Sequence, residues 1–189
     1  MIKAVVFDFW GTLVENGIYP SPIRQVKHVL KLRMPFSKFI IPFETVFMTK
    51  EYDDLFQAFT QVCKAFNVNP TKSKLEKLVG IWNKNKLLAK PYSETMSVLE
   101  DLKKDYKLAL VSNTDFSTIE FLLEKFDMKK YFDVIMLSFR VGMLKMNPEM
   151  FRGVLDKLGV NANEAVMVGD TIESDINTAR NVGMHAILI

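Results

Sequence analysis

The run Ala4-Val-Val-Phe7, followed by Asp8 and then by Gly11, decides the fold of this chain. Its apolar residues follow one another without alternation, which is typical of a strand buried on both faces in a parallel sheet. Asp8 stands where this strand ends, and ligands of open α/β sheets bind at the carboxyl ends of the strands. A buried carboxylate there needs a positive partner. Asp8 is therefore a candidate nucleophile or metal ligand, although an ordinary turn aspartate after a strand would look the same.

The composition is that of an ordinary globular protein. Of 189 residues, 49% are apolar and 25% are charged, and the net charge is only +3. This length allows one sizeable core with a modest insertion. Basic residues are scattered among acidic ones, so nothing in the sequence predicts a nucleic-acid partner.

The sequence predicts a cytoplasmic protein that does not bind a membrane. Cys63 is the only cysteine, so no internal disulfide can form, which suits a reducing compartment. No apolar run approaches the length of a membrane span. Because the sequence opens directly into a strand, we also expect no signal peptide.

Residues 15–89 are expected to be entirely helical. Apolar residues recur at helical spacing over residues 23–32, 52–66 and 75–82. The stretch 36–48 is apolar and aromatic with Pro42 inside it, so a short helix and an irregular segment both remain open. The aromatic residues of this block are interpreted as its own core rather than as a cofactor site.

Beyond Pro91, strands and helices alternate. We expect helices over residues 93–104, 117–126, 148–158 and 174–182, and strands over 108–111, 134–137, 165–168 and 186–189. This alternation predicts the α/β class, with a parallel-sheet, Rossmann-like core that carries helices on both faces. The first strand must join that sheet. The core domain is therefore expected to comprise residues 1–14 and 90–189, and the helical domain 15–89 is an insertion.

Polar residues follow several of the predicted strands, and a parallel sheet brings such residues to one edge. They are Asp8 and Thr12 after the first strand, Ser112 and Asn113 after the second, Lys145 beyond the third, and Asp170 and Asp175 after the fourth. Each has a plain explanation by itself. Serine and threonine satisfy turns, most lysines are solvated, and aspartates cap helices.

Together, these motifs resemble those of the haloacid dehalogenase-like hydrolase superfamily, over residues 1–14 and 90–189. The first motif is Asp8-Phe-Trp-Gly-Thr-Leu13, and the second is Val111-Ser-Asn113. The third is Lys145 with Pro148, although Met146 and Asn147 replace the usual proline after the lysine. The acidic fourth motif runs from Val168 to Asp175. The position of the helical insertion implies the mobile cap of that superfamily.

The resemblance implies a phosphatase that uses Mg²⁺ and a small, phosphorylated substrate. Asp8 would attack phosphorus and form an aspartyl intermediate, with Lys145 as the second catalytic residue. The metal would be held by Asp8, Asp170 and the backbone carbonyl of Trp10, with Asp175 bound to the metal directly or through another ligand. The phosphate oxygens would accept hydrogen bonds from three side chains, those of Thr12, Ser112 and Asn113. Trp10 is also expected to contact the substrate.

Trp10 departs from the family pattern, because most phosphatases of the superfamily carry a second aspartate there as general acid. An indole has no titratable acid in the working range, so alkyl phosphates are expected to be poorer substrates than acyl or aryl phosphates. The 2-haloacid dehalogenases carry an aromatic residue at this position, which makes dehalogenation the alternative. Asp170 argues against it, because a serine stands there in the dehalogenases. A weakly catalytic, ligand-binding protein is the third possibility.

Overall fold

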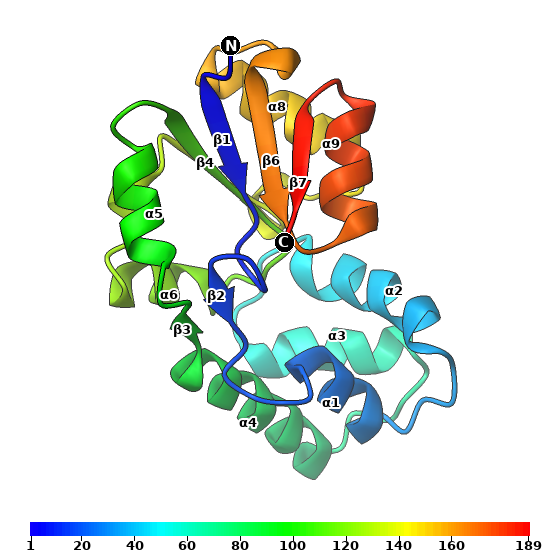
Figure 1. The fold of residues 1–189 in the computed structure, drawn as a ribbon. Helices are drawn as coiled ribbons and strands as arrows, with labels where there is room; N and C mark the ends of the chain where they lie inside the picture. The colour runs from blue at the N-terminus through cyan, green and yellow to red at the C-terminus, as the bar shows by residue number, and fades with distance from the viewer.

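The computed structural model describes residues 1–189, and its core is a five-stranded sheet. The strands are β1 (Ala4–Phe7), β4 (Lys107–Ser112), β5 (Val134–Leu137), β6 (Ala165–Gly169) and β7 (His185–Leu188). They lie in the order β5-β4-β1-β6-β7, and every neighbouring pair is parallel (Figure 1). β1 is therefore central, and its unbroken apolar run fits a strand that is buried on both faces.

Alternate residues of β1 enter two separate apolar clusters, one on each face of the sheet. Val5 and Phe7 pack with the helices α5 (Thr95–Leu102) and α6 (Ile119–Lys125). Ala4 and Val6 pack on the other face with α8 (Pro148–Leu158) and α9 (Thr178–Asn181). This arrangement confirms the predicted α/β class, because the sheet is covered by helices on both faces.

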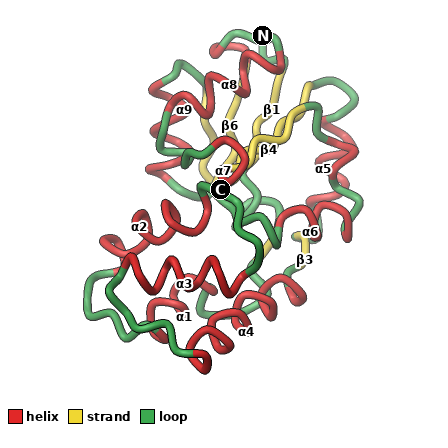
Figure 2. The backbone as a smooth tube through the Cα atoms, turned by 180° about the vertical axis from the view of Figure 1, so that it is seen from behind, coloured by secondary structure: helices red, strands yellow, loops and turns green.

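Four helices form a cap between β2 (Val14–Glu15) and β3 (Lys90–Pro91). They are α1 (Pro22–Val29), α2 (Phe36–Met48), α3 (Leu55–Ala65) and α4 (Lys72–Leu88). β2 and β3 pair antiparallel, so the chain leaves the core and returns to it through adjacent strands. The cap helices gather beyond the carboxyl ends of the sheet, as both views show (Figures 1 and 2).

The cap has an aromatic core of its own. Phe39, Phe43 and Phe47 recur every four residues along one face of α2, where they are fully buried against Phe59 and Trp82. This packing settles the segment that the sequence leaves open: residues 36–48 are helical although Pro42 lies inside the helix. Proline in a helix interior removes one backbone hydrogen bond, and the burial of three phenylalanines offsets that loss.

The short elements are the ones that the sequence pattern does not predict. They include α7 (Ser138–Val141) and the 3₁₀ turns η1 (Lys129–Tyr131) and η2 (Ala162–Glu164). The helix expected over residues 174–182 is instead a π-helix, η3 (Ile172–Asn177), that continues into α9. No helix combines the length and the apolar character that crossing a membrane requires.

Candidate active site

The predicted polar residues lie at the edge of the sheet that faces the cap. Asp8 follows β1, and its backbone N–H donates to the carbonyl of Val168 on the adjacent β6, with an N–O distance of 3.0 Å. Ser112 ends β4 on the other side of β1, and Asp170 follows β6 directly. Lys145 lies in the loop between α7 and α8. Neighbouring strands therefore bring together residues that lie more than a hundred positions apart.

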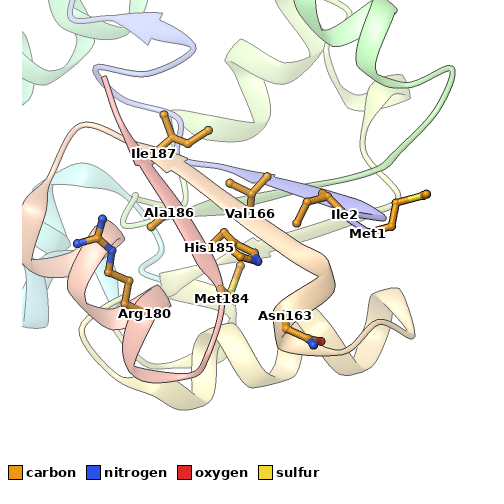
Figure 3. A pocket seen from close by; sticks show the side chains of 9 residues that line it. All are labelled: Met1, Ile2, Asn163, Val166, Arg180, Met184, His185, Ala186 and Ile187. Carbon is orange, nitrogen blue, oxygen red and sulfur yellow. The ribbon is translucent and has the colours of Figure 1, made fainter.

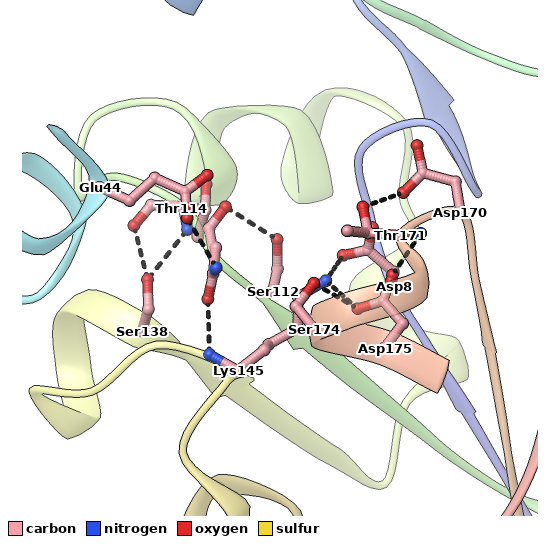
Figure 4. A network of polar contacts seen from close by, with 11 residues as sticks. Asp8, Glu44, Ser112, Thr114, Ser138, Lys145, Asp170, Thr171, Ser174 and Asp175 are labelled. Atoms are coloured by element: carbon pink, nitrogen blue, oxygen red, sulfur yellow. Dashed lines mark hydrogen bonds and ion pairs between the residues drawn. The ribbon is translucent and has the colours of Figure 1, made fainter. Parts of the chain in front are cut away.

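A buried lysine joins two buried carboxylates at the centre of this edge. Nζ of Lys145 lies 2.5 Å from Oδ1 of Asp8 and 2.6 Å from Oδ1 of Asp175. All three residues are almost without solvent contact, with 3%, 4% and 0% of their surface exposed. Figure 4 shows these side chains converging from three segments of the core. One cation thus faces two anions in a place that water scarcely reaches.

This excess of negative charge affects the pKa values of Asp8 and Lys145. Burial raises the pKa of Asp8 to about 7, against the opposing charge of Lys145. The nearby carboxylates of Asp175 and Asp170 raise this pKa further. Burial opposes the charged form of Lys145, but Asp8 and Asp175 hold its pKa above the ordinary value. Lys145 is therefore a fixed positive charge. Because it faces two carboxylates, the site can accept a second positive charge.

Three carboxylates are close enough to share a metal ion. One oxygen from each of Asp8, Asp170 and Asp175 lies within 4.8 Å of the others. Asp170 is exposed, so the cluster opens to solvent on one side. Carboxylate oxygens are the ligands that hard divalent cations such as Mg²⁺ prefer. The donor set and its excess of negative charge therefore fit a divalent cation.

Two glycines give these carboxylates their space. A Cβ atom on Gly11, whose φ is +79°, would lie 2.1 Å from Oδ2 of Asp170. A Cβ atom on Gly169 would lie 2.4 Å from Oδ2 of Asp175. Both contacts are far inside the van der Waals limit. The carboxylate cluster thus requires glycine at these two positions, since any side chain there would displace a carboxylate oxygen.

Asp175 is held by the π-helix that carries it. Its Oδ2 accepts a hydrogen bond from the backbone N–H of Thr171, with an N–O distance of 3.1 Å. Single π-turns occur frequently at functional sites. Here the turn points a fully buried carboxylate at Lys145 and at the end of β1.

Asn113 connects the loop after β4 to the lysine loop and to the cap. Its Oδ1 accepts from the backbone N–H of Lys145 at 2.8 Å, and its Nδ2 donates to Oε2 of Glu44 at 2.9 Å. Ser112 is fully buried, and its hydroxyl makes only a long contact of 3.5 Å with the carbonyl of Asn113. The buried hydroxyl of Thr12 has no hydrogen-bond partner. The predicted phosphate donors thus have hydrogen-bonding capacity to spare.

This arrangement can be compared with known proteins. A model of the haloacid dehalogenase-like hydrolases matches residues 5–189. The chain belongs to this family. One relative of this hydrolase is glyceraldehyde 3-phosphate phosphatase from Methanothermobacter thermautotrophicus. The two are 28% identical over 198 residues, which cover 100% of this chain and 86% of the relative.

Two solved structures share the fold of this hydrolase. A family member from Bacteroides thetaiotaomicron, in complex with magnesium and inorganic phosphate, superposes with a TM-score of 0.70 at 16% identity, over 100% of this chain and 94% of that one. A 2-haloacid dehalogenase from Pseudomonas syringae superposes with a TM-score of 0.65 at 21% identity, over 100% and 86%. At these identities the two likenesses establish the fold alone.

Trp10 is the one aromatic residue among the predicted site residues of the hydrolase. Its ring is partly buried and packs edge-on against Phe9, with centroids 5.2 Å apart and planes at 89°. It also contacts the apolar cluster beneath α5 and α6. No titratable side chain other than Asp8 stands between β1 and β2.

Sequence reasoning missed Glu44, an acid that contacts the site, and it gave no role to Asp115, which follows the second predicted strand. Glu44 is the only acid of α2, and burial raises its pKa to about 7. Asp115 is buried, and its Oδ2 accepts from the indole Nε1 of Trp82 on the cap at 2.9 Å. The one signal for Glu44 was a single acid within a strongly apolar segment.

A separate hollow of about 700 Å³ lies near the amino ends of β6 and β7. Its lining includes Val166, Met184 and Ala186, which surround the start of β7 (Figure 3). None of the predicted active-site residues contributes to it. The hollow is therefore separate from the carboxylate cluster at the carboxyl ends of the strands.

Proposed function

We propose that this hydrolase cleaves phosphate monoesters of a small molecule through a covalent intermediate on Asp8. The observation that carries this proposal is the buried Lys145, which holds Asp8 on one side and Asp175 on the other. An isolated carboxylate in that position would be neutralised by burial, whereas a fixed ammonium keeps its oxygen available as a nucleophile. The kinship with a glyceraldehyde 3-phosphate phosphatase supports a phosphorylated substrate.

We propose that Asp8, Asp170 and Asp175 hold Mg²⁺, together with the backbone carbonyl of Trp10. The fit is supported by the three oxygens within 4.8 Å and by the glycines that make room for them. When bound, Mg²⁺ would neutralise charge on the phosphoryl oxygens.

The positions of the side chains support the remaining roles in this proposal. Oδ of Asp8 attacks phosphorus, the bond from phosphorus to the leaving ester oxygen breaks, and Lys145 supplies a point charge to the nucleophile and to the transferred group. The phosphoryl oxygens accept hydrogen bonds from Asn113, Ser112 and Thr12, whose hydroxyl has no partner of its own. Water then attacks phosphorus and releases Asp8.

We also propose that Trp10 transfers no proton. The turn between β1 and β2 by itself therefore suits leaving groups that depart without a proton. An indole offers one weak donor, and its ring is engaged with Phe9. The cap, assigned to residues 15–89, then determines which small molecule enters, since its α2 contributes Glu44 to the site.

Trp10 favours a second function, 2-haloacid dehalogenation. An aromatic residue at position 10 suits that reaction because halide leaves without a proton. The three-carboxylate cluster favours the phosphatase, because a metal-free reaction has no use for Asp170 beside Asp8 and Asp175. A direct assay separates the two. Aryl phosphate and 2-chloropropionate are each offered with Mg²⁺ and with EDTA. A phosphatase releases phosphate only with Mg²⁺, and a dehalogenase releases chloride in both conditions.

A further inference from the structure

The cap contributes one acidic side chain to the active site, Glu44 on α2. Its Oε2 accepts a hydrogen bond from Nδ2 of Asn113 at 2.9 Å, and the same amide accepts from the backbone of Lys145. Figure 4 shows Glu44 entering this network from the cap side, opposite the metal-binding carboxylates. Because Asn113 is assigned to a phosphate oxygen, the carboxyl lies one hydrogen-bonded group away from the phosphoryl position.

The surroundings of Glu44 favour a carboxyl that is easily protonated. Its neighbours along α2, Phe43 and Phe47, are fully buried in the cap core. Three groups from the core act on it: Lys145 and Asn113 stabilise the ionised form, and Asp175 disfavours it. Burial outweighs these contributions and raises the pKa to about 7. A phosphate dianion in the site would disfavour the ionised form further.

The other titratable side chains of the network already have roles. Asp8 is the nucleophile, Asp170 and Asp175 complete the carboxylate cluster, and Lys145 is held by Asp8 and Asp175. Glu44 alone has none, and the leaving group of a substrate bound at Asp8 must point away from Asp8, toward the cap. A general acid works best when its pKa lies near the working pH.

We propose that Glu44 is the general acid and base of the reaction, delivering from the cap the proton that residue 10 cannot deliver. The inference rests on the proposed phosphatase function. In the first step the bond between Asp8 and phosphorus forms, the bond to the leaving oxygen breaks, and the Glu44 carboxyl gives its proton to that oxygen. In the second step the Glu44 carboxylate takes a proton from the attacking water. The bond from that water to phosphorus forms, and the bond from phosphorus to Asp8 breaks.

This role of Glu44 widens the range of substrates beyond those that the turn between β1 and β2 would allow by itself. With Glu44 present, alkyl phosphates, whose leaving groups are basic, become substrates together with aryl phosphates. Without it, the enzyme should show the preference expected from Trp10. General acid–base catalysis is typically worth roughly 10²–10⁴ in rate, and this is the size of effect to expect on alkyl esters.

The test compares Glu44→Gln with the wild type and with a matched control, Glu76→Gln, which changes an exposed glutamate on α4 of the same cap. kcat/KM is measured with Mg²⁺ for phosphate esters whose leaving groups span a wide range of pKa. Glu44→Gln should lose roughly 10²–10⁴ on alkyl esters and much less on nitrophenyl phosphate. For alkyl esters, kcat/KM of the wild type should decline above about pH 7, and this decline should be absent in Glu44→Gln. Glu76→Gln should match the wild type throughout.

Several outcomes would overturn the role of Glu44. An equal loss on alkyl and aryl esters would mean that Glu44 only positions Asn113, and an unchanged rate would mean that it does nothing. Weaker Mg²⁺ binding by Glu44→Gln, measured by calorimetry, would make it a metal ligand instead. If Glu44→Gln fails to fold, Glu44→Ala serves for the same comparison. A wild type that hydrolyses no phosphate ester would overturn both the proposed function and the role of Glu44. The preceding outcomes would overturn only the role of Glu44.

Discussion

Trp82 of the cap donates a hydrogen bond from Nε1 to Oδ2 of Asp115 in the core, at 2.9 Å. The contact is buried, and Oδ1 of the same carboxylate accepts from Ser117 and Thr118. The indole also packs on Phe47 and Phe59 within the cap core. One side chain therefore belongs to the cap's apolar core and ties α4 to the loop after β4.

Trp82→Phe should weaken the protein, because it leaves Oδ2 of Asp115 buried without its donor. The expected loss in the free energy of unfolding is about 1–3 kcal/mol, the cost of one unsatisfied buried polar group. Urea denaturation followed by circular dichroism measures it. A variant within 0.3 kcal/mol of the wild type, a margin of about the usual additivity error, would show that water replaces the indole N–H without cost.

Asp170→Asn should weaken Mg²⁺ binding, because it removes one of three clustered negative charges at the metal site. Isothermal titration calorimetry measures the affinity. Glu173→Gln is the control, since Glu173 is exposed and lies outside the cluster, and it should bind Mg²⁺ as the wild type does. Equal affinity in Asp170→Asn and the wild type would argue against a metal site at this edge of the sheet.

Gly11→Ala should also weaken Mg²⁺ binding, although it changes no charge. The new methyl group would lie 2.1 Å from Oδ2 of Asp170 and must push that carboxylate away. Gly159→Ala is a matched control, because Gly159 also has a positive φ, +65°, but no atom lies within 4 Å of its added Cβ. Both variants should lose some stability from backbone strain, and only Gly11→Ala should lose metal affinity. The same affinity in both variants would contradict the proposed placement of Asp170.

Without metal, the stability of the protein should depend on pH through Glu44. Its pKa rises from 4.5 in the unfolded chain to about 7 in the fold, so the folded state binds more protons between these values. The stabilising contribution is complete below about pH 4.5 and is lost as the pH rises through about 7. Thermal unfolding in EDTA should show Glu44→Gln gaining stability relative to the wild type over this window. Parallel profiles for the two proteins would contradict the raised pKa.

The sequence predicts the core and most of the site because both depend on local patterns. The apolar run before Asp8 places that residue at a strand end, and the parallel order of β1 and β6 brings Asp170 to its side. Glu44 was not predictable in this way. Its contact with Asn113 joins residues separated by 69 positions across the insertion, and Pro42 left the helical state of its segment open.

Other features were unpredictable because of their length or backbone geometry. β2 and β3 span only two residues each, too few for any periodicity to appear. The π-turn that carries Asp175 has no sequence signature distinct from an α-helix. The burial of Lys145 could not be read from its neighbours in the sequence, since its partners lie far away along the chain, Asp8 after β1 and Asp175 in η3.

Phosphate release from nitrophenyl phosphate by the wild type and by Asp8→Asn, each with Mg²⁺ and with EDTA, tests the central claim most directly. The account predicts rapid release by the wild type with Mg²⁺, and background rates in EDTA and for the folded Asp8→Asn variant in both conditions. Asp8→Asn retaining most of the wild-type rate, or a wild type equally active in EDTA, would contradict a metal-assisted aspartyl mechanism.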